Sequence, residues 1–225
     1  MNNNVYHDLK SYAKSEGIGS LVLDQYGMKI ENSLTPYVLE ERQLNVTQID
    51  VFSRLLMERI IWIGGEVDDH MSTIVQAQLM FLDSVDHNDI RLHIDTPGGS
   101  VKSGLSMIDV MDYVHSDIVT VNTGIAASMG SLLLGAGTKG KRASLRFSKT
   151  MIHQSSGGFS GKFTDAKINM EEWGKYNKII FELLGQYCGK DPIEVEAEAE
   201  KDKWFTAEEA LKYGIIDEVV IKKKK

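Results

Sequence analysis

Residues 118–134, IVTVNTGIAASMGSLLL, decide the fold class, because they predict a buried strand that runs directly into a helix. Ile118–Val121 is apolar and β-branched, which favours a strand. Ser128–Leu134 is predicted to be a helix, and the glycine-rich segment Gly135–Gly140 ends it. A strand followed at once by a helix is the repeating unit of α/β proteins, so the neighbouring segments should repeat it.

The segments on either side do repeat this alternation. The predicted strands are Ile60–Ile63, Ile90–Ile94, Ala143–Phe147, Thr150–Ile152 and Ile215–Ile221. The predicted helices are Phe52–Met57, Ser72–Leu82, Val101–Val114, Asp165–Tyr187 and a short helix opened by a Thr206/Glu209 capping box. In Ser72–Leu82, the helical spacing is carried by Ile74, Ala77, Phe81 and Leu82. The chain is therefore predicted to be α/β.

Residues 1–32 differ from the rest of the chain. They have little periodicity, and Gly17 and Gly19 interrupt any helix. We expect this segment to be an extension or a propeptide, and residues 33–225 to form a single domain. No linker or internal repeat divides that domain.

The composition limits the functions that the chain can have. It is 42% hydrophobic and 25% charged, as in ordinary globular proteins. The net charge is −7 although Lys222–Lys225 adds four positive charges, so the acidic body argues against nucleic-acid binding. Cys188 is the only cysteine, which excludes an internal disulfide, and we expect a packed thiol rather than a nucleophile. No apolar run approaches the roughly 18 residues of a membrane span, and no signal peptide is recognisable.

Three short motifs carry candidate chemistry. Gly124-Ile-Ala-Ala-Ser128-Met-Gly130 places a serine between small residues, as in a nucleophile elbow, although a plain N-cap serine is the alternative. Thr96-Pro-Gly-Gly99 follows a strand, and its amides suit an oxyanion hole or an ordinary turn. Met151-Ile-His153-Gln154 ends a strand with a histidine that suits a general base or a structural role.

Two other patterns are rejected. Gly135–Lys141 fits GxxxxGK, but Arg142 stands where a phosphate loop needs Ser or Thr, and the segment leaves a helix instead of entering one. Asp68-Asp69-His70 is a weak metal candidate, and His87 is expected to be solvated. No metal is therefore expected.

Together the three motifs resemble the ClpP family, the proteolytic subunits of Clp proteases. Phe52-Ser-Arg-Leu-Leu56 and Glu58-Arg-Ile-Ile61 add to the resemblance, which runs from about Ser33 to Val220. It implies the ClpP/crotonase-like spiral of repeated β-β-α units with a protruding strand–helix handle at about residues 153–188. It also implies an axial N-terminal segment at about residues 33–50 and a propeptide before it.

The resemblance implies a serine endopeptidase that degrades unfolded polypeptides. Ser128 matches the nucleophile and His153 the base, while Asp202, ahead of Trp204 and Thr206-Ala-Glu-Glu-Ala210, matches the acid. The backbone amides of Gly99 and Met129 match the oxyanion hole.

The family also implies partners. Two heptameric rings of this chain would stack into a chamber, with Glu200 and Lys201 at the ring–ring contact. A AAA+ unfoldase of the ClpX, ClpA or ClpC type would feed the chamber and dock at Arg91, His93 and Tyr113. That partner would use the ATP, so no cofactor is expected in this chain, and the location implied is cytoplasmic.

The chain departs from the family pattern at several positions. Arg91 and His93 stand where aromatic residues are common, and Asp95 begins an Asp-Thr-Pro run in place of the usual Asn-Ser-Pro. Ser155 replaces a frequent proline, which we expect to loosen the handle strand. Lys201 replaces a frequent arginine and cannot form its bidentate fork, so ring pairing should be weaker.

Two other classes remain open. A catalytically silent scaffold subunit would share the fold but lack a member of the triad. A crotonase-type acyl-CoA enzyme would use backbone oxyanion holes but has no need of Ser128, His153 and Asp202 together.

Overall fold

The computed structural model describes residues 37–42, 45–158 and 162–221, and the chain divides into two compact units, Met1–Arg54 and Leu55–Lys225. In the first unit, β1 (Tyr37–Arg42) and β2 (Asn45–Asp50) form an antiparallel hairpin that the sequence pattern does not predict. Helix α3 (Val51–Met57) follows it. The expected propeptide, residues 1–32, and its boundary at residue 33 lie outside the described residues.

The second unit is built on one mixed sheet. Its main path runs in the order β3 (Ile60–Gly64), β4 (Ile90–Thr96), β5 (Ile118–Ala127), β6 (Arg142–Leu145) and β9 (Glu218–Val220), and each neighbouring pair is parallel. β7 (Lys149–Ile152) pairs with β5 in parallel and with β8 (Lys203–Thr206) in antiparallel fashion. The α/β prediction is confirmed.

Strand β5 is longer than predicted because it serves two neighbours in turn. Thr120–Asn122 pairs with β6, and Ile125–Ala127 pairs with β7. The ladder to β4 shifts register between these two parts, and the Asp95 carboxylate accepts a 2.9 Å hydrogen bond from the Ile125 amide there. A side chain at Gly124 would collide with Asp95, so the glycine permits this close approach. The bend carries the end of β5 toward β7.

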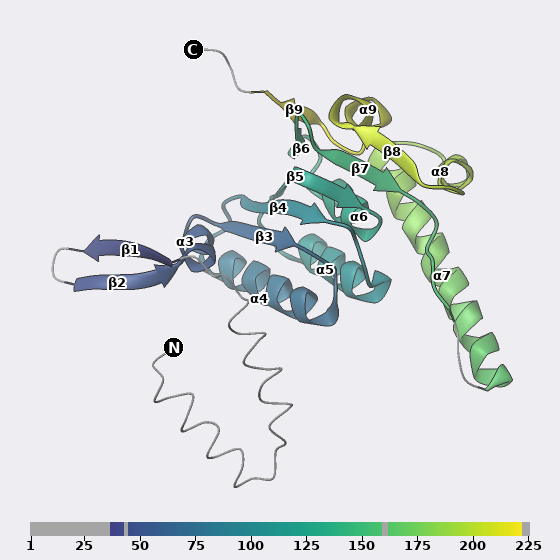
Figure 1. Ribbon diagram of the computed structural model, residues 1–225, viewed down its shortest axis with the longest axis horizontal. Coiled ribbons are helices and arrows are strands. Elements are labelled where there is room, and N and C mark those ends of the chain that lie inside the picture. Colours follow the sequence, from purple (N-terminus) through teal and green to yellow (C-terminus); the bar gives the residue numbers. More distant parts are fainter. Residues whose placement is uncertain (1–36, 43–44, 159–161, 222–225) are drawn as a thin grey trace, which may run out of the picture. The chain divides into compact units, whose positions relative to one another are not determined.

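The helices connect the strands, and α4 (Asp69–Val85) and α5 (Val101–Tyr113) lie side by side below β3 and β4 in Figure 1. Further helices in the described ranges are α6 (Met129–Gly135), α7 (Phe163–Cys188), α8 (Pro192–Glu198) and α9 (Ala207–Tyr213). The capping box of α9 is confirmed, since Thr206 and Glu209 exchange hydrogen bonds. Neither α8 nor β8 was predicted.

The sequence pattern selected the wrong face of α4. Its buried residues are Ser72, Val75, Leu79 and Leu82. Ile74 and Phe81, which carry the predicted spacing, are 43% and 58% exposed. Ser72 is accepted in the interior because its hydroxyl donates a 2.8 Å hydrogen bond to the Ser103 carbonyl. Apolar residues occur on two faces of this helix, and periodicity alone does not say which face is buried.

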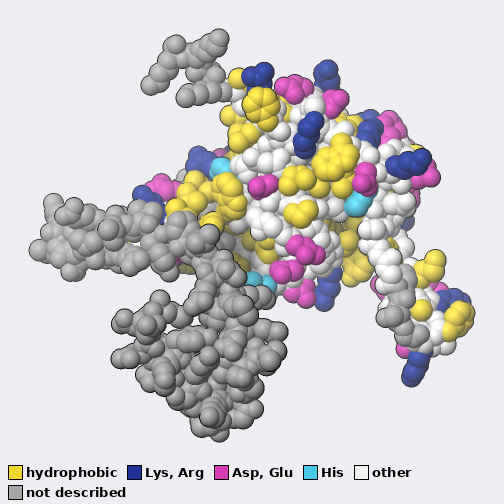
Figure 2. Space-filling model, in the orientation of Figure 1, with side chains coloured by type: hydrophobic (Ala, Val, Ile, Leu, Met, Phe, Trp, Pro, Cys, Tyr) yellow, Lys and Arg dark blue, Asp and Glu magenta, His cyan; other side chains and the backbone are white. Residues whose placement is uncertain are grey.

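Helix α7 is confirmed almost as predicted and ends at Gly189 in the left-handed conformation (φ 67°). Its buried side chains lie in the second half only, around Phe181 and Leu184. The first half projects away from the sheet in Figure 1. Phe163 and Ile168 are 85% and 60% exposed on this half, and Figure 2 shows hydrophobic and charged side chains together at its free end.

A buried ion pair joins the last strands. Arg142, 1% exposed, makes a bidentate contact with Asp217 at 2.6 and 2.8 Å. Asp217 also accepts a 2.7 Å bond from the Gly140 amide. In the loop that resembles a phosphate loop, this backbone N–H therefore binds a carboxylate of the same chain. The loop leaves α6 and enters β6, as expected. The predicted strand Ile215–Ile221 is shorter, because Ile215 and Ile216 pack into the core before β9 begins.

Candidate active site

Ser128 lies between the end of β5 and the start of α6, on a strained turn. Its φ and ψ are 54° and −121°, a combination that is rare for a residue with a side chain. Its amide donates to the Met151 carbonyl at 2.9 Å, and its carbonyl accepts from the Ser131 amide and hydroxyl. Its side chain makes no capping hydrogen bond, so the plain N-cap interpretation is wrong. The turn leaves the hydroxyl available for another partner.

That partner is His153, which follows β7 directly. His153 Nε2 lies 2.9 Å from Ser128 Oγ, and His153 Nδ1 lies 3.0 Å from Asp202 Oδ1. Sheet pairing explains this convergence. Ala127 pairs with Met151, and Ile152 pairs with Lys203. Ser128, His153 and Asp202 are the next residues beyond these pairs, so they meet at one end of the three strands.

Gln154, which follows the histidine, makes two hydrogen bonds that the sequence motif did not reveal. Its amide donates to the Ala199 carbonyl at 2.8 Å, and its side chain donates to the Glu200 carbonyl at 3.0 Å. These two bonds tie the segment after β7 to the loop that leads into Asp202. The histidine and the acid are therefore held by a shared backbone network as well as by their own contact.

The glycine turn after β4 packs against the serine. A side chain on Gly98 (φ 94°) would lie within 2.7 Å of the Ser128 Cβ and 3.0 Å of the Met129 amide nitrogen, so only glycine fits. The Thr96 hydroxyl accepts a 3.1 Å bond from the Gly98 amide and donates to the Gly65 carbonyl. The threonine thus fixes the turn that faces the serine.

The backbone N–H groups of Gly99 and Met129, which the sequence predicts to form the oxyanion hole, are both located next to Ser128. The Gly98 carbonyl accepts a 2.8 Å bond from the Val67 amide, and the N–H of a trans peptide points opposite to the carbonyl of the same peptide. The Gly99 amide therefore points away from Val67. Met129 is the first residue of α6, where backbone amides have no partner within the helix. Both N–H groups are thus suited to receive an oxyanion.

The chemical capacity of this arrangement is that of a serine hydrolase. With the proton on Nδ1, the imidazole donates to Asp202 and accepts from the Ser128 hydroxyl, which is the tautomer that a general base requires. An open groove lined by Gly99, Trp173 and Tyr176, among others, runs from the glycine turn toward α7. The groove therefore borders the predicted oxyanion-hole residue Gly99 and is open to an extended chain.

The predicted docking residues lie away from this site. Arg91 and Tyr113 are exposed, and His93 is half-buried on β4. Trp62 on β3, which the sequence analysis did not single out, pairs with His93 in register and stacks on it, with ring centroids 5.4 Å apart and planes 4° apart. Burial and then the charge of Arg91 lower the pKa of His93, which favours the neutral ring. Trp62 therefore supplies an exposed aromatic surface at this place.

The predicted ring-contact residues Glu200 and Lys201 are both exposed and directly precede Asp202. Ser155, which stands where the family often has a proline, bonds to helix α7. Its amide and hydroxyl both donate to Asn177 on α7, at 3.2 and 2.9 Å, and its hydroxyl accepts from the Trp173 ring nitrogen. These hydrogen bonds connect the segment after β7 directly to α7.

The rejected candidates have other uses. Burial raises the pKa of Cys188 to about 11, so its thiol is protonated and a poor nucleophile at neutral pH. Asp68 caps α4 by accepting from the Met71 amide, and Asp69 accepts from the Ser103 hydroxyl. Within the described ranges, no helix has the length and apolar character needed to cross a membrane.

Comparison with known proteins gives a consistent result. The Clp protease family matches residues 42–223. The ATP-dependent Clp protease proteolytic subunit of Bacteroides fragilis (strain YCH46) is 48% identical over 218 residues, which cover 96% of this chain and 99% of that protein. The protein of the same name from Porphyromonas gingivalis is 43% identical over 221 residues, covering 97% of this chain and 100% of the relative.

Proposed function

Because this chain belongs to the Clp protease family and is a Clp-type peptidase, we propose that Ser128, His153 and Asp202 are its catalytic triad. The observation that carries the proposal is the continuous contact from Ser128 Oγ through the imidazole to Asp202 Oδ1, with steps of 2.9 and 3.0 Å. A silent scaffold would lack part of this set, and an acyl-CoA enzyme of the crotonase type would not need it.

The proposed mechanism follows from the positions of these groups. His153 Nε2 takes the proton of Ser128 as the serine oxygen attacks a peptide carbonyl. Asp202 holds the imidazole in the required tautomer and stabilises the imidazolium. The amides of Gly99 and Met129 stabilise the tetrahedral oxyanion. His153 then protonates the leaving amine, and water resolves the acyl-enzyme by the same steps in reverse. These residues complete the reaction without a cofactor in this chain.

The decisive test is hydrolysis of a short fluorogenic peptide by wild type, Ser128→Ala and Ser131→Ala. Ser128→Ala should lose all measurable turnover and all labelling by a fluorophosphonate, while its oligomeric state is unchanged. Ser131 is the matched control, because its hydroxyl donates to the Ser128 carbonyl and not to the Ser128 hydroxyl, so turnover should stay within a few-fold of wild type. Near-wild-type turnover of Ser128→Ala would exclude the proposed triad.

For the assembly we propose two stacked heptameric rings of this chain. Support comes from the projecting first half of α7, whose exposed Phe163, Ile168 and Met170 are too apolar for a helix surrounded only by water. Glu200 and Lys201, next to the acid of the triad, are the proposed ring–ring contacts. Such a contact would couple ring pairing to the position of Asp202.

The proposed partner is a AAA+ unfoldase of the ClpX, ClpA or ClpC type, which would spend ATP and deliver unfolded polypeptide into the chamber. Its loops would dock against Tyr113, Arg91 and the stacked pair of Trp62 and His93. Because Arg91 offers a charge where the family often has an aromatic ring, we expect the partner's loop to carry an acidic or aromatic residue there.

The proposed location is the cytoplasm, and a chain with one cysteine and no disulfide is compatible with that reducing compartment. We also propose that residues 1–32 are a propeptide that the mature peptidase removes. The match to the Bacteroides fragilis protein covers too much of the chain for all of residues 1–32 to lie beyond it, so that relative shares at least part of the segment.

A further inference from the structure

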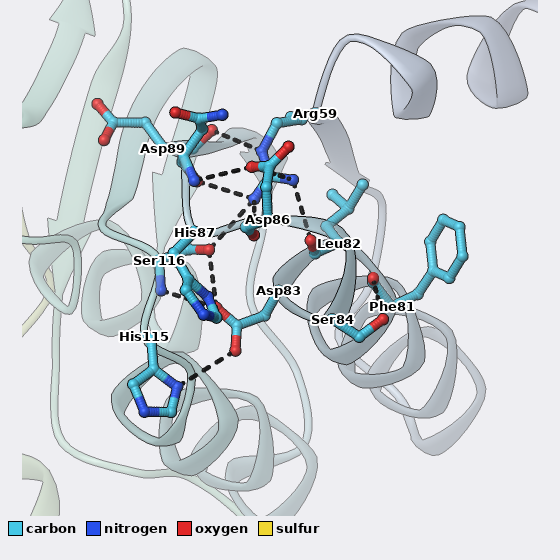
Figure 3. Close-up of polar contacts among 11 residues, drawn as sticks. Arg59, Phe81, Leu82, Asp83, Ser84, Asp86, His87, Asp89, His115 and Ser116 are labelled. Atoms are coloured by element: carbon cyan, nitrogen blue, oxygen red, sulfur yellow. Dashed lines mark hydrogen bonds and ion pairs between the residues drawn. The ribbon is translucent and has the colours of Figure 1, made fainter.

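Three side chains of the types that bind metal ions lie close together at the end of the sheet opposite to Ser128. Asp83 lies in the last turn of α4, His87 in the loop after it, and His115 in the loop after α5 (Figure 3). These loops lead into the amino ends of β4 and β5, whereas Ser128 follows the carboxyl end of β5. The cluster is therefore separate from the proposed triad.

The spacing of the three groups fits one ion. His87 Nδ1 lies 3.1 Å from Asp83 Oδ1, and His115 Nδ1 lies 3.5 Å from Asp83 Oδ2. One ligand atom from each residue lies within 4.8 Å of the other two. Tetrahedral zinc with bonds of about 2.0–2.1 Å needs ligand atoms about 3.3 Å apart. The separations of 3.1 and 3.5 Å between the carboxylate and the two imidazoles lie close to that value.

The carboxylate is already oriented for this task. The Ser116 amide and hydroxyl both donate to Asp83 Oδ1 at 2.8 Å. Asp83 Oδ2 is left facing His115 (Figure 3). Orientation of a ligating carboxylate by neighbouring donors is a common feature of metal sites.

The loop that carries His87 is fixed by Arg59. This arginine adopts φ 60°, and its guanidinium donates to the carbonyls of Leu82 and Asn88 at 2.9 and 2.8 Å. It also pairs with Asp86 at 3.1 Å, so its positive charge is matched by an acid outside the cluster. The backbone on both sides of His87 is thus held in place without an uncompensated cation at the cluster.

We propose that Asp83, His87 and His115 bind a divalent transition-metal ion of the Zn²⁺ class. Two imidazoles with one carboxylate favour such ions over Ca²⁺ or Mg²⁺, which prefer oxygen ligands. The side chains of His87 and His115 are 63% and 79% exposed, so an ion and its remaining water ligands have access. This assignment departs from the sequence analysis, which expected no metal and a solvated His87.

The test is titration of the full chain, freed of metal by a chelator, with Zn²⁺ in a calorimeter and with Co²⁺ in a visible spectrometer. One ion per chain and d–d bands of Co²⁺ are expected. His87→Ala and His115→Ala should each weaken Zn²⁺ binding by more than about 100-fold, and Ser116→Ala by about 10-fold. Both histidines are exposed, so their variants should keep the wild-type melting temperature.

Two matched controls make the outcome specific. His70→Ala removes an exposed histidine beside Asp68 and Asp69, and His153→Ala removes a histidine that is paired with a carboxylate outside the cluster. Both should bind Zn²⁺ like wild type, which would support the assignment. Unchanged affinity in the His87→Ala/His115→Ala double variant, or no Co²⁺ bands in wild type, would overturn it.

Discussion

Asp202 Oδ1 lies 3.0 Å from His153 Nδ1, although the carboxylate is 60% exposed in the single chain. The two residues are 49 positions apart and meet because β7 and β8 pair in antiparallel fashion. The imidazole itself is 21% exposed. Its orientation therefore depends on an acid that strand pairing and the bonds from Gln154 help to keep in place.

We expect Asp202→Asn to lower kcat for a short peptide by about 10⁴, because an amide would favour the wrong imidazole tautomer while leaving the geometry intact. Steady-state kinetics with an unchanged sedimentation profile would establish this. The matched control is Glu200→Gln, which neutralises an adjacent exposed acid. If both variants lost turnover to the same extent, the loss would reflect local charge or assembly and not the triad.

The buried pair of Arg142 and Asp217 should matter for stability. Removing one partner of such a pair leaves an uncompensated charge, so Arg142→Met should destabilise the chain by about 3–5 kcal/mol. The Arg142→Met/Asp217→Leu double variant should recover part of that loss. Chemical denaturation at pH 7 measures the free energy of unfolding of both single variants and of the double variant. A loss in the double variant equal to the sum of the losses in Arg142→Met and Asp217→Leu would contradict the pairing.

The same pair predicts a dependence of stability on pH. Burial would raise the pKa of Asp217, but its bonds to Arg142 and the arginine charge lower it to about 2. Since the folded-state pKa lies below the usual 3.8, the pair stabilises the fold above about pH 4 and loses this contribution as pH falls toward 2. The melting-temperature difference between wild type and Asp217→Asn should therefore shrink over that range.

Residues 1–32 are expected to be removed by the peptidase itself. The intact mass of purified wild type should be smaller than that of Ser128→Ala by roughly this segment. Mixing Ser128→Ala with wild type would show whether cleavage also occurs between chains. If both proteins kept the full-length mass, self-processing would be wrong, although the peptidase assignment would stand.

Much of the fold is predictable from local pattern, and the failures have physical causes. The strand and helix on either side of Ser128 were predicted correctly, because a β-branched run favours a strand and the following glycine-rich segment limits the helix. The hairpin of β1 and β2 and the strand β8 were missed, since short polar strands carry a weak periodicity signal. The buried face of α4 was misassigned because the polar Ser72 is accommodated there by a tertiary hydrogen bond, which sequence does not reveal.

The candidate site divides in the same way. Ser128, Gly99 and His153 lie in local motifs, whereas Asp202 came only from resemblance to a family, because strand pairing brings it to the histidine. The cluster of Asp83, His87 and His115 has no local motif beyond one i, i+4 pair. Its third member joins through the packing of α4 against α5, so its existence depends on tertiary structure.

The stacked pair of Trp62 and His93 gives the last prediction. Trp62 is 42% exposed, and an exposed tryptophan held by stacking is a typical binding hot spot. Trp62→Ala should weaken binding of the cognate unfoldase by about 30-fold, equivalent to about 2 kcal/mol, while hydrolysis of short peptides is unchanged. Ile193→Ala, which removes a 75% exposed apolar residue on α8, is the matched control.

The Arg91→Tyr/His93→Tyr double variant tests co-adaptation at the same surface, and we expect it to bind the cognate partner less well. Tighter binding and faster degradation of folded substrate by that variant would show instead that wild-type docking is weak.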